Sequence, residues 1–301
     1  MKPKPLFRGA RVALLSTSGK VRAERLERAI MSIKELGLIP IVYNSCTMEH
    51  GYLAGGDDLR VRELNAAFLD SSIDGILCMR GGYGANRILP LLDYNKIAEN
   101  PKVFCGYSDI TAIHIALNKF CGLETYHTPM PASELYQGID DYTMSYYKAL
   151  IFGDKIHYFV NPVGSEMKSL VKGVVSAELV GGNLSLVVAS LGTPYEIVTK
   201  NKILFLEDVS EEVYRIDGML THLRNAGKLR ECAGIILGAF SGSKESEESS
   251  LTLLEVFHEL IVPEKKPCIM NVACGHVLPT LSLPLGANIT IDANQCKIYF
   301  T

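Results

Sequence analysis

Short apolar segments alternate with amphipathic helical segments through the first half of the chain, and this alternation constrains the fold most. Residues 11–15 have the composition of a buried strand, and residues 22–36 then repeat their apolar side chains with helical periodicity. Further apolar segments at 39–43, 75–79 and 103–106 are also followed by helical patterns. Strands that alternate with helices in this way form a parallel sheet covered by helices on both faces. We therefore predict an α/β fold.

The pattern changes after about residue 150, which indicates a second domain. The segment 151–170 is irregular and interrupted by glycine and proline, as is typical of a connection. We predict an N-terminal domain over 1–150, a linker over 151–170 and a C-terminal domain of strands and helices over 171–301. Within the C-terminal domain, the polar stretch 241–250 is predicted to be a solvated loop.

Charge, hydropathy and cysteine usage exclude several classes of protein. The net charge of -3 and the lack of a basic stripe argue against binding of nucleic acid. No segment approaches the ~20 apolar residues of a membrane span, and Val12 to Leu15 is too short for the apolar core of a signal peptide. The eight cysteines lie mostly in apolar runs, without CxxC spacing, which indicates reduced thiols rather than a metal site. We expect a cytoplasmic protein that contacts neither nucleic acid nor membrane.

A glycine-rich motif follows the predicted strand at 75–79. In Arg80 to Gly84, glycines let the backbone approach a ligand closely and direct N–H groups toward it. Such a loop can hold a phosphate or stabilise an oxyanion, although a tight strand-to-helix turn would account for the glycines equally well. It is not a Walker loop, because no Gly-Lys-Ser/Thr follows.

Ser108 lies in the motif that follows the predicted strand at 103–106. A strand, a sharp turn and a helix resemble a nucleophile elbow. At a helix N-terminus the dipole and the free N–H groups favour the negative charge of a tetrahedral intermediate. Serine is also a common N-cap residue, so the pattern leaves both roles open. Ile110 stands where ordinary α/β-hydrolases have a second glycine, which disfavours that fold.

An acid and a histidine in the second half complete the set of candidates. The predicted strand at 203–206 ends in Glu207 and Asp208, and an acid there can orient a histidine or cap the next segment. His276 lies in a loop bounded by glycine and proline and is suited to move protons near neutral pH. His127 also follows a turn and remains a rival, although the loop position favours His276.

Seven short motifs stand in one order along the chain: Arg80-Gly-Gly-Tyr-Gly84, Gly106-Tyr-Ser-Asp-Ile-Thr111, Gly181-Gly-Asn-Leu-Ser185, Phe205-Leu-Glu-Asp208, Tyr214-Arg-Ile-Asp217, Gly275-His276 and Leu283-Pro-Leu-Gly286. In these motifs and their order, the chain resembles the LD-carboxypeptidase family, also called muramoyltetrapeptide carboxypeptidases. The resemblance extends from about Gly9 to the end of the chain. The resemblance implies an N-terminal flavodoxin-like parallel sheet with helices on both faces. It also implies a smaller C-terminal β-rich α/β domain and a homodimer.

The resemblance also implies roles for individual residues. Ser108 would be the nucleophile, His276 its general base and Glu207 the acid that orients the base. No metal or organic cofactor is expected. The resemblance further implies an oxyanion hole formed by the backbone N–H groups of Gly82 and Asp109. Contacts to a small peptide substrate are expected from Arg80, Gly81 and Asn183.

The activity implied is that of a serine carboxypeptidase. Members of the family hydrolyse the amide between an L-configured centre and a terminal D-amino acid, typically releasing D-alanine from cytoplasmic murein tetrapeptide in cell-wall recycling. A related branch hydrolyses the peptide-nucleotide microcin C and gives self-immunity. Aromatic stacking, often by tryptophan, helps to hold such a nucleotide base, and the absence of tryptophan here favours the murein enzyme. Outside the carboxypeptidases, the remaining alternatives are a non-catalytic protein that binds a small ligand and a protein that binds a flavin or a nucleotide.

Overall fold

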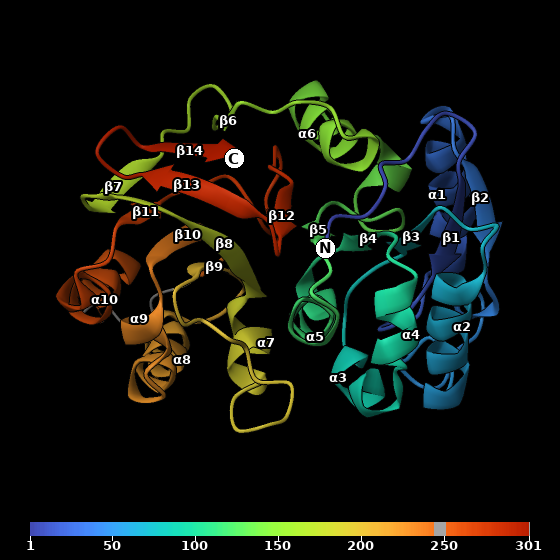
Figure 1. The fold of residues 1–301 in the computed structure, drawn as a ribbon, viewed down its shortest axis with the longest axis horizontal. Coiled ribbons are helices and arrows are strands. Elements are labelled where there is room, and N and C mark those ends of the chain that lie inside the picture. Colours follow the sequence, from blue (N-terminus) through green and yellow to red (C-terminus); the bar gives the residue numbers. More distant parts are fainter. Residues whose placement is uncertain (244–250, 301) are drawn as a thin grey trace. The chain divides into compact units, whose positions relative to one another are not determined.

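The computed structural model describes residues 1–243 and 251–300, which form two compact units (Figure 1). Unit 1 comprises Met1–Lys155 and a short return segment, Ser282–Gly286. Unit 2 comprises Ile156–Leu281 and the residues from Ala287 onward. Each unit is built on its own sheet. Most of the loop predicted at 241–250 lies outside the described residues.

Unit 1 contains a six-stranded sheet with the order β12-β5-β4-β3-β1-β2. Five strands run parallel: β1 (Arg11–Leu15), β2 (Ile39–Val42), β3 (Gly75–Cys78), β4 (Val103–Gly106) and β5 (Thr125–His127). Every residue of β3 and β4 is buried, as expected of strands covered on both faces. The order β2-β1-β3-β4-β5 is that of flavodoxin-like sheets, which confirms the expected class.

The helices of unit 1 cover both faces of this sheet (Figure 1). After β1 the chain moves outward to β2, and it then returns across the sheet through β3, β4 and β5. Right-handed crossovers place the helix after β1 on one face of the sheet and the helices between β2 and β5 on the other. The elements are α1 (Ala23–Glu35), α2 (Asp57–Leu69), α3 (Ala85–Ile88), α4 (Tyr94–Glu99), α5 (Thr111–Cys121) and α6 (Asp141–Phe152), with 3-10 turns η1 (Asn44–Cys46), η2 (Leu89–Leu91), η3 (Ser108–Ile110) and η4 (Leu135–Gln137).

The direction of winding reverses between β1 and β3, and this reversal positions the site of unit 1. At such a switch point the loops after neighbouring strands diverge to opposite faces and leave room for a ligand beyond the carboxyl ends of the strands. The glycine-rich loop follows β3, and Ser108 follows the adjacent β4. The topology therefore brings together two motifs that are separated along the chain.

A sixth strand of unit 1 comes from a distant part of the sequence. In β12 (Leu283–Leu285), Leu283 pairs antiparallel with His127 and Leu285 with Thr125 of β5. Pro284 cannot donate to a ladder, so it suits the edge position that β12 occupies. The sequence did not predict this strand, because three residues that include a proline carry no local strand pattern.

Unit 2 contains an eight-stranded mixed sheet with the order β6-β14-β13-β8-β9-β10-β11-β7. Its parallel centre consists of β8 (Val174–Asn183), β9 (Ile203–Val209), β10 (Gly234–Ser241) and β11 (Cys268–Met270). Antiparallel strands flank this centre: β6 (Tyr158–Phe159), β7 (Lys168–Val171), β13 (Asn288–Asp292) and β14 (Lys297–Phe300). This is the β-rich α/β domain that the resemblance implied.

Helices of unit 2 gather around α8, which contacts three others (Figure 1). They are α7 (Leu184–Ala189), α8 (Val213–Asn225), α9 (Lys228–Glu231) and α10 (Leu253–Leu260), followed by the 3-10 turn η5 (Val262–Glu264). Helix α10 begins with a capping box in which Thr252 and Glu255 satisfy each other's backbone N–H groups.

The segment 151–170, predicted to be a linker, contains the end of α6, strand β6 and most of β7. The boundary between the units falls inside it, after Lys155. Strand β6 pairs with β14 and β7 pairs with β11, so both extend the edges of the second sheet. Backbone pairing of this kind needs no alternating side-chain pattern, which is why the segment reads as irregular in the sequence.

All eight cysteines lie within the described residues and are free, and seven of them are buried. Burial raises the pKa of the Cys46 thiol and of the Cys105 thiol to about 12. These side chains are therefore neutral and pack as small apolar groups. This agrees with the prediction of core thiols.

Candidate active site

Ser108 is held in a strained backbone conformation at the turn between β4 and α5. Its φ is 64°, in the left-handed region that a serine seldom adopts and that costs on the order of 1–3 kcal/mol. The N-cap alternative is not supported, because Tyr107 precedes η3 and Ile110 precedes α5, and neither helix start has a side-chain cap. Strand, strained serine and helix together have the geometry of a nucleophile elbow.

The glycine-rich loop packs directly against this serine. A Cβ placed on Gly81 would lie 2.9 Å from Ser108 Oγ and 3.4 Å from the backbone nitrogen of Asp109. Only glycine leaves room for that approach. Gly82 has a φ of +117°, where any side chain would be strained. The structure thus brings the predicted loop together with the serine and with the residue that follows it.

The Asp109 side chain holds this arrangement in place. Its Oδ2 accepts a hydrogen bond from the backbone N–H of Ala85, the first residue of α3, at 2.8 Å. Burial raises the pKa of this carboxyl, while the nearby Ser18 hydroxyl, the backbone N–H of Ala85 and the charge of Arg60 act in the opposite direction. The prediction assigned only a backbone role to Asp109; its carboxylate also joins the elbow to the glycine-rich loop.

Arg60 is a buried residue that the sequence analysis missed. From α2 its Nη1 donates to the backbone oxygen of Thr17, after β1, and to that of Gly84, after β3, the latter at 3.0 Å. The guanidinium also pairs with Asp57. Arginines on amphipathic helices usually face solvent, so the pattern gave no sign of this role. Arg60 therefore ties two strand-end loops of the site together.

Arg80, at the start of the glycine-rich loop, is half-buried and donates to the backbone oxygen of Lys20 at 3.1 Å. Burial lowers the pKa of its guanidinium, and the charges of Arg25 and Arg22 lower it further. A guanidinium nevertheless stays charged in a protein. Three neighbouring cations favour an anionic ligand, and the fork of an arginine suits a carboxylate.

In unit 2, Glu207 and His276 form a hydrogen-bonded pair. The Nδ1 of His276 lies 2.8 Å from Glu207 Oε2, and the backbone N–H of His276 donates to the same oxygen at 3.3 Å. Glu207 is fully buried, whereas the His276 side chain is 18% exposed. A carboxylate only accepts hydrogen bonds, so Nδ1 carries the proton and Nε2 has the acceptor role. This is how an acid orients a general base.

Two glycines make room for the Glu207 side chain. A Cβ on Gly275 would lie 2.5 Å from Glu207 Oε2, and a Cβ on Gly238 would lie 3.1 Å from the Glu207 Cβ. Gly275 also has a φ of +120°, which favours glycine. The Oγ of Ser241 donates to the backbone oxygen of His276 at 2.6 Å and fixes the loop. The glycine before His276 was the sequence signal for this close approach.

Asn183 and Asp208, which lie next to Glu207 in the sheet, form hydrogen bonds that stabilise the start of α7. Asp208 accepts from Asn183 Nδ2 at 3.0 Å and from the backbone N–H and Oγ of Ser185 at 3.0 and 2.8 Å. Asn183 stands opposite Glu207 in the β8–β9 ladder, and its Oδ1 caps α7 by accepting from Leu186. The side chain of Asn183 thus has a structural role, and its predicted contact with substrate stays a prediction.

His127, the rival of His276, lies in the core of unit 1. It is 2% exposed on β5, with its ring centroid 5.4 Å from that of Tyr107. Glu207 instead pairs with His276. Of the two candidate histidines, His276 is therefore the one that contacts Glu207.

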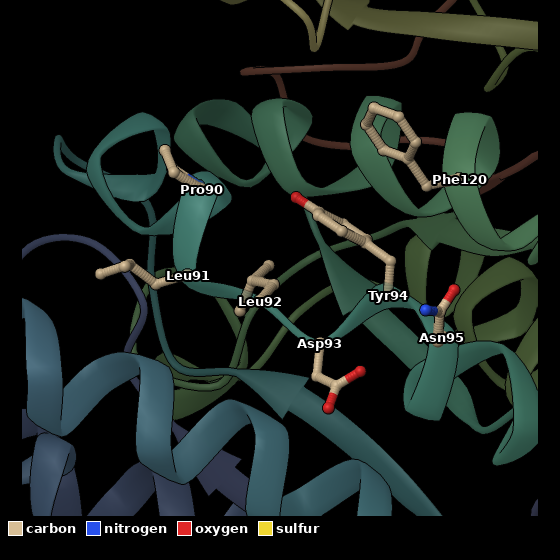
Figure 2. Close-up of a pocket in the computed structure, with 7 residues that line it drawn as sticks. All are labelled: Pro90, Leu91, Leu92, Asp93, Tyr94, Asn95 and Phe120. Atoms are coloured by element: carbon tan, nitrogen blue, oxygen red, sulfur yellow. The ribbon is translucent and has the colours of Figure 1, made fainter.

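A shallow cavity of about 550 Å³ on unit 1 is lined by none of the predicted site residues (Figure 2). Its polar groups serve the local structure. The hydroxyl of Tyr94 donates to the backbone oxygen of Leu89 at 2.8 Å, and Asp93 caps α4 through Lys96 N–H. The Tyr94 ring packs on Phe120 with centroids 4.8 Å apart. This cavity offers no catalytic chemistry.

The described part of the chain offers no metal cluster: no three side chains of His, Cys, Asp or Glu within 1–243 and 251–300 are grouped to hold an ion. Nor is any helix among those residues long and apolar enough to cross a membrane.

Comparison with known proteins agrees with the fold. Residues 12–128 match the LD-carboxypeptidase N-terminal domain, and residues 176–291 match the LD-carboxypeptidase C-terminal domain. The chain is a hydrolase built of two α/β units. It belongs to the LD-carboxypeptidase family.

The chain is similar to several known proteins over nearly its whole length. It is 38% identical over 298 residues to the probable murein peptide carboxypeptidase of Bacillus subtilis, covering 98% of this chain and 92% of that protein. The muramoyltetrapeptide carboxypeptidase from Oxalobacter formigenes has a similar structure, with a TM-score of 0.83 and 27% identity over 97% of this chain and 100% of that one. The structure of MccF in complex with glutamyl sulfamoyl guanosine gives a TM-score of 0.92 over 99% and 98% of the two chains. At 22% identity this likeness is one of fold alone.

Proposed function

We propose that this protein is a serine carboxypeptidase that hydrolyses the amide between an L-configured centre and the terminal D-amino acid of a murein peptide. The observation that carries the proposal is the φ of 64° at Ser108, because such strain at a strand-to-helix turn is characteristic of an exposed nucleophile. The Glu207–His276 hydrogen bond of 2.8 Å supports it by supplying an oriented base. The murein substrate is supported by the name of the Bacillus subtilis relative.

In this proposal Ser108, His276 and Glu207 act as a triad. His276 Nε2 takes the proton of Ser108 Oγ as that oxygen attacks the scissile carbonyl, and Glu207 stabilises the imidazolium. The backbone N–H groups of Gly82 and Asp109 bind the oxyanion, where one donor is typically worth about 10²–10³ in rate. His276 then protonates the leaving D-amino acid, and water releases the acyl group from Ser108.

Recognition of a chain end requires a group that binds its free carboxylate. We assign this role to Arg80, because Arg22 and Arg25 add positive charge around its guanidinium. Gly81 and Asn183 complete the proposed substrate contacts. The free, buried thiols support a reducing compartment such as the cytoplasm.

The test is incubation of the protein with murein tetrapeptide and, separately, with an aminoacyl nucleotide, with products identified by mass. We expect release of D-alanine from the tetrapeptide. Ser108→Ala should lower the turnover at least about 10³-fold, since the nucleophile is lost. Ser71→Ala, at an exposed serine of unit 1, is the matched control and should leave the rate unchanged. Peptide binding without release of D-alanine would instead support the non-catalytic alternative.

A further inference from the structure

The segment 128–138, which follows β5 in unit 1, is attached to the ends of two neighbouring strands. The backbone N–H of Thr128 donates to the oxygen of Gly106, the last residue of β4, at 3.2 Å. The backbone N–H of Ala132 donates to the oxygen of Met79, which directly follows β3, at 2.8 Å. These two strands lead into the turn of the proposed nucleophile and into the glycine-rich loop. The segment therefore contacts both at the points where they leave the sheet.

The side chain of Glu134 adds a connection to the residue that precedes the nucleophile. Its Oε1 accepts a hydrogen bond from the hydroxyl of Tyr107 at 2.8 Å, and its Oε2 accepts from the backbone N–H of Met130 at 2.9 Å. Tyr107 directly precedes Ser108, and its side chain is buried. One carboxylate thus joins the Tyr107 side chain to the backbone of the segment 128–138.

The segment gives Glu134 a fixed base. The backbone N–H of Glu134 donates to the oxygen of Met130 at 3.1 Å and closes a turn. From α1, Nη1 of Arg25 donates to the backbone oxygen of Ala132 at 3.2 Å. The guanidinium carbon of Arg25 also lies 4.7 Å from the centroid of the Tyr136 ring, within the range of a cation–π contact. The position of Glu134 is therefore set by its own turn and by a neighbouring helix.

The strained backbone of Ser108 needs such supports on both sides. A residue in the left-handed region keeps that conformation only where its surroundings over-determine it. After Ser108, the carboxylate of Asp109 is bonded to the backbone N–H of Ala85. Before Ser108, the hydroxyl of Tyr107 is bonded to Glu134. The serine thus lies between two residues whose side chains are each attached to another loop.

We propose that Glu134 is a positioning residue that acts through Tyr107 to hold Ser108 in its strained conformation. The inference rests on the proposed function, in which Ser108 is the nucleophile. When the bond to Glu134 is lost, the turn relaxes and Ser108 Oγ moves away from the geometry of attack. Such a displacement lowers the rate of the chemical step and leaves the affinity for the substrate unchanged.

Three variants test the proposal through the separation of kcat from KM. Tyr107→Phe removes the hydroxyl and keeps the ring, and Glu134→Ala removes both carboxylate oxygens. In each, we expect kcat for release of D-alanine from murein tetrapeptide to fall about 10–100-fold, with KM within about twofold. Glu134→Gln should retain most of the activity, because an amide can accept from Met130 N–H and donate to the Tyr107 oxygen.

Two matched variants of unit 1 separate positioning from general loss of stability. Tyr94→Phe removes a hydroxyl that donates to the backbone oxygen of Leu89. Asp140→Ala removes a carboxylate that accepts from the backbone N–H and the hydroxyl of Thr143. Both should leave kcat unchanged, with melting temperatures measured for every variant. A similar fall of kcat in these controls would overturn the proposal, and so would a raised KM with normal kcat in Glu134→Ala.

The conformation of Ser108 can also be measured without turnover, which distinguishes failure of this inference from failure of the proposed function. In protein labelled with ¹³C-serine, the signal of Ser108 is the one absent from Ser108→Ala, and its Cα and Cβ chemical shifts depend on φ and ψ. We expect these shifts to change in Tyr107→Phe and Glu134→Ala but not in Tyr94→Phe. That result supports the positioning role even if no peptide is hydrolysed. Unchanged shifts in all variants would overturn it, even if the unaltered protein releases D-alanine.

Discussion

The carboxylate of Asp109 accepts a hydrogen bond from the backbone N–H of Ala85 at 2.8 Å. It thereby joins the residue after Ser108 to the helix that follows the glycine-rich loop. The two motifs come from the ends of neighbouring strands, and each supplies one backbone N–H group to the proposed oxyanion hole. The distance between those donors thus depends on a side chain that contributes no atom to the reaction.

We predict that Asp109→Asn lowers kcat about tenfold or more with little change in KM. The new amide presents N–H groups where the carboxylate only accepts, so the loop shifts relative to the elbow, and small displacements of reacting groups can cost up to about 10²-fold in rate. The measurement is the separation of kcat from KM together with the melting temperature. Asp93→Asn, at the cap of α4, is the control and should leave kcat unchanged. A normal kcat in Asp109→Asn would contradict this positioning role.

Gly81→Ala should lower the activity about 10²-fold. The added Cβ would lie 2.8 Å from the Cβ of Ser108 and 2.9 Å from its Oγ, so the serine must move. The backbone of Gly81 is not left-handed, which makes the change a steric test of the serine position. Gly56→Ala, where a Cβ meets nothing within 4 Å, is the control. Full activity of Gly81→Ala would mean that Ser108 Oγ is not the group whose position matters.

Local patterns in the sequence predicted β1 to β4 of the first sheet and β9 of the second, because a buried parallel strand is a short apolar run that can be recognised without its neighbours. They missed the interior strands β5 and β11, which have only three residues each, and they failed at the sheet edges. Strands β6, β7 and β12 are held by backbone pairing with distant partners, and their own residues show neither alternation nor a sustained apolar run.

The candidate site divides in the same way. Ser108, Glu207 and His276 could be singled out because each lies in a turn after a strand or in a loop bounded by glycine. Arg60 could not, because its burial depends on two carbonyl oxygens that only the folded sheet brings to it. The pairing of Glu207 with His276 is likewise a tertiary contact, and the sequence could indicate only that each residue suits its role.

Glu207→Gln should reduce kcat about 10³–10⁴-fold while the protein stays folded. An amide can donate to Nδ1 and so favour the wrong tautomer of His276, and it cannot stabilise an imidazolium. Turnover of murein tetrapeptide in the steady state measures the loss. Glu178→Gln removes the partner of Lys202, which lies just before β9, and serves as the control; this ion pair of 2.6 Å is partly exposed. A loss of less than about tenfold would remove Glu207 from the proposed triad.

His114 should make the stability of the protein depend on pH. It is fully buried on α5, and burial lowers the pKa of its imidazole to about 4, although Nε2 is bonded to the backbone oxygen of Gly106 at 2.9 Å. In the unfolded chain the pKa is about 6.5. Between these values the unfolded chain binds a proton that the folded chain does not. The free energy of unfolding therefore falls as the pH is lowered through this window, by about 3 kcal/mol in total.

The control for this effect follows from the same contacts. His114→Gln retains an N–H donor for Gly106 but cannot be protonated, so its unfolding free energy should lack this component of the pH dependence. His258→Gln changes an exposed histidine on α10 and should keep the slope of the unaltered protein. Urea unfolding followed by circular dichroism from about pH 7 to pH 4 compares the three proteins. Parallel curves for all three would mean that His114 accepts a proton in the folded state, despite an Nδ1 that has no hydrogen-bond partner among the described residues.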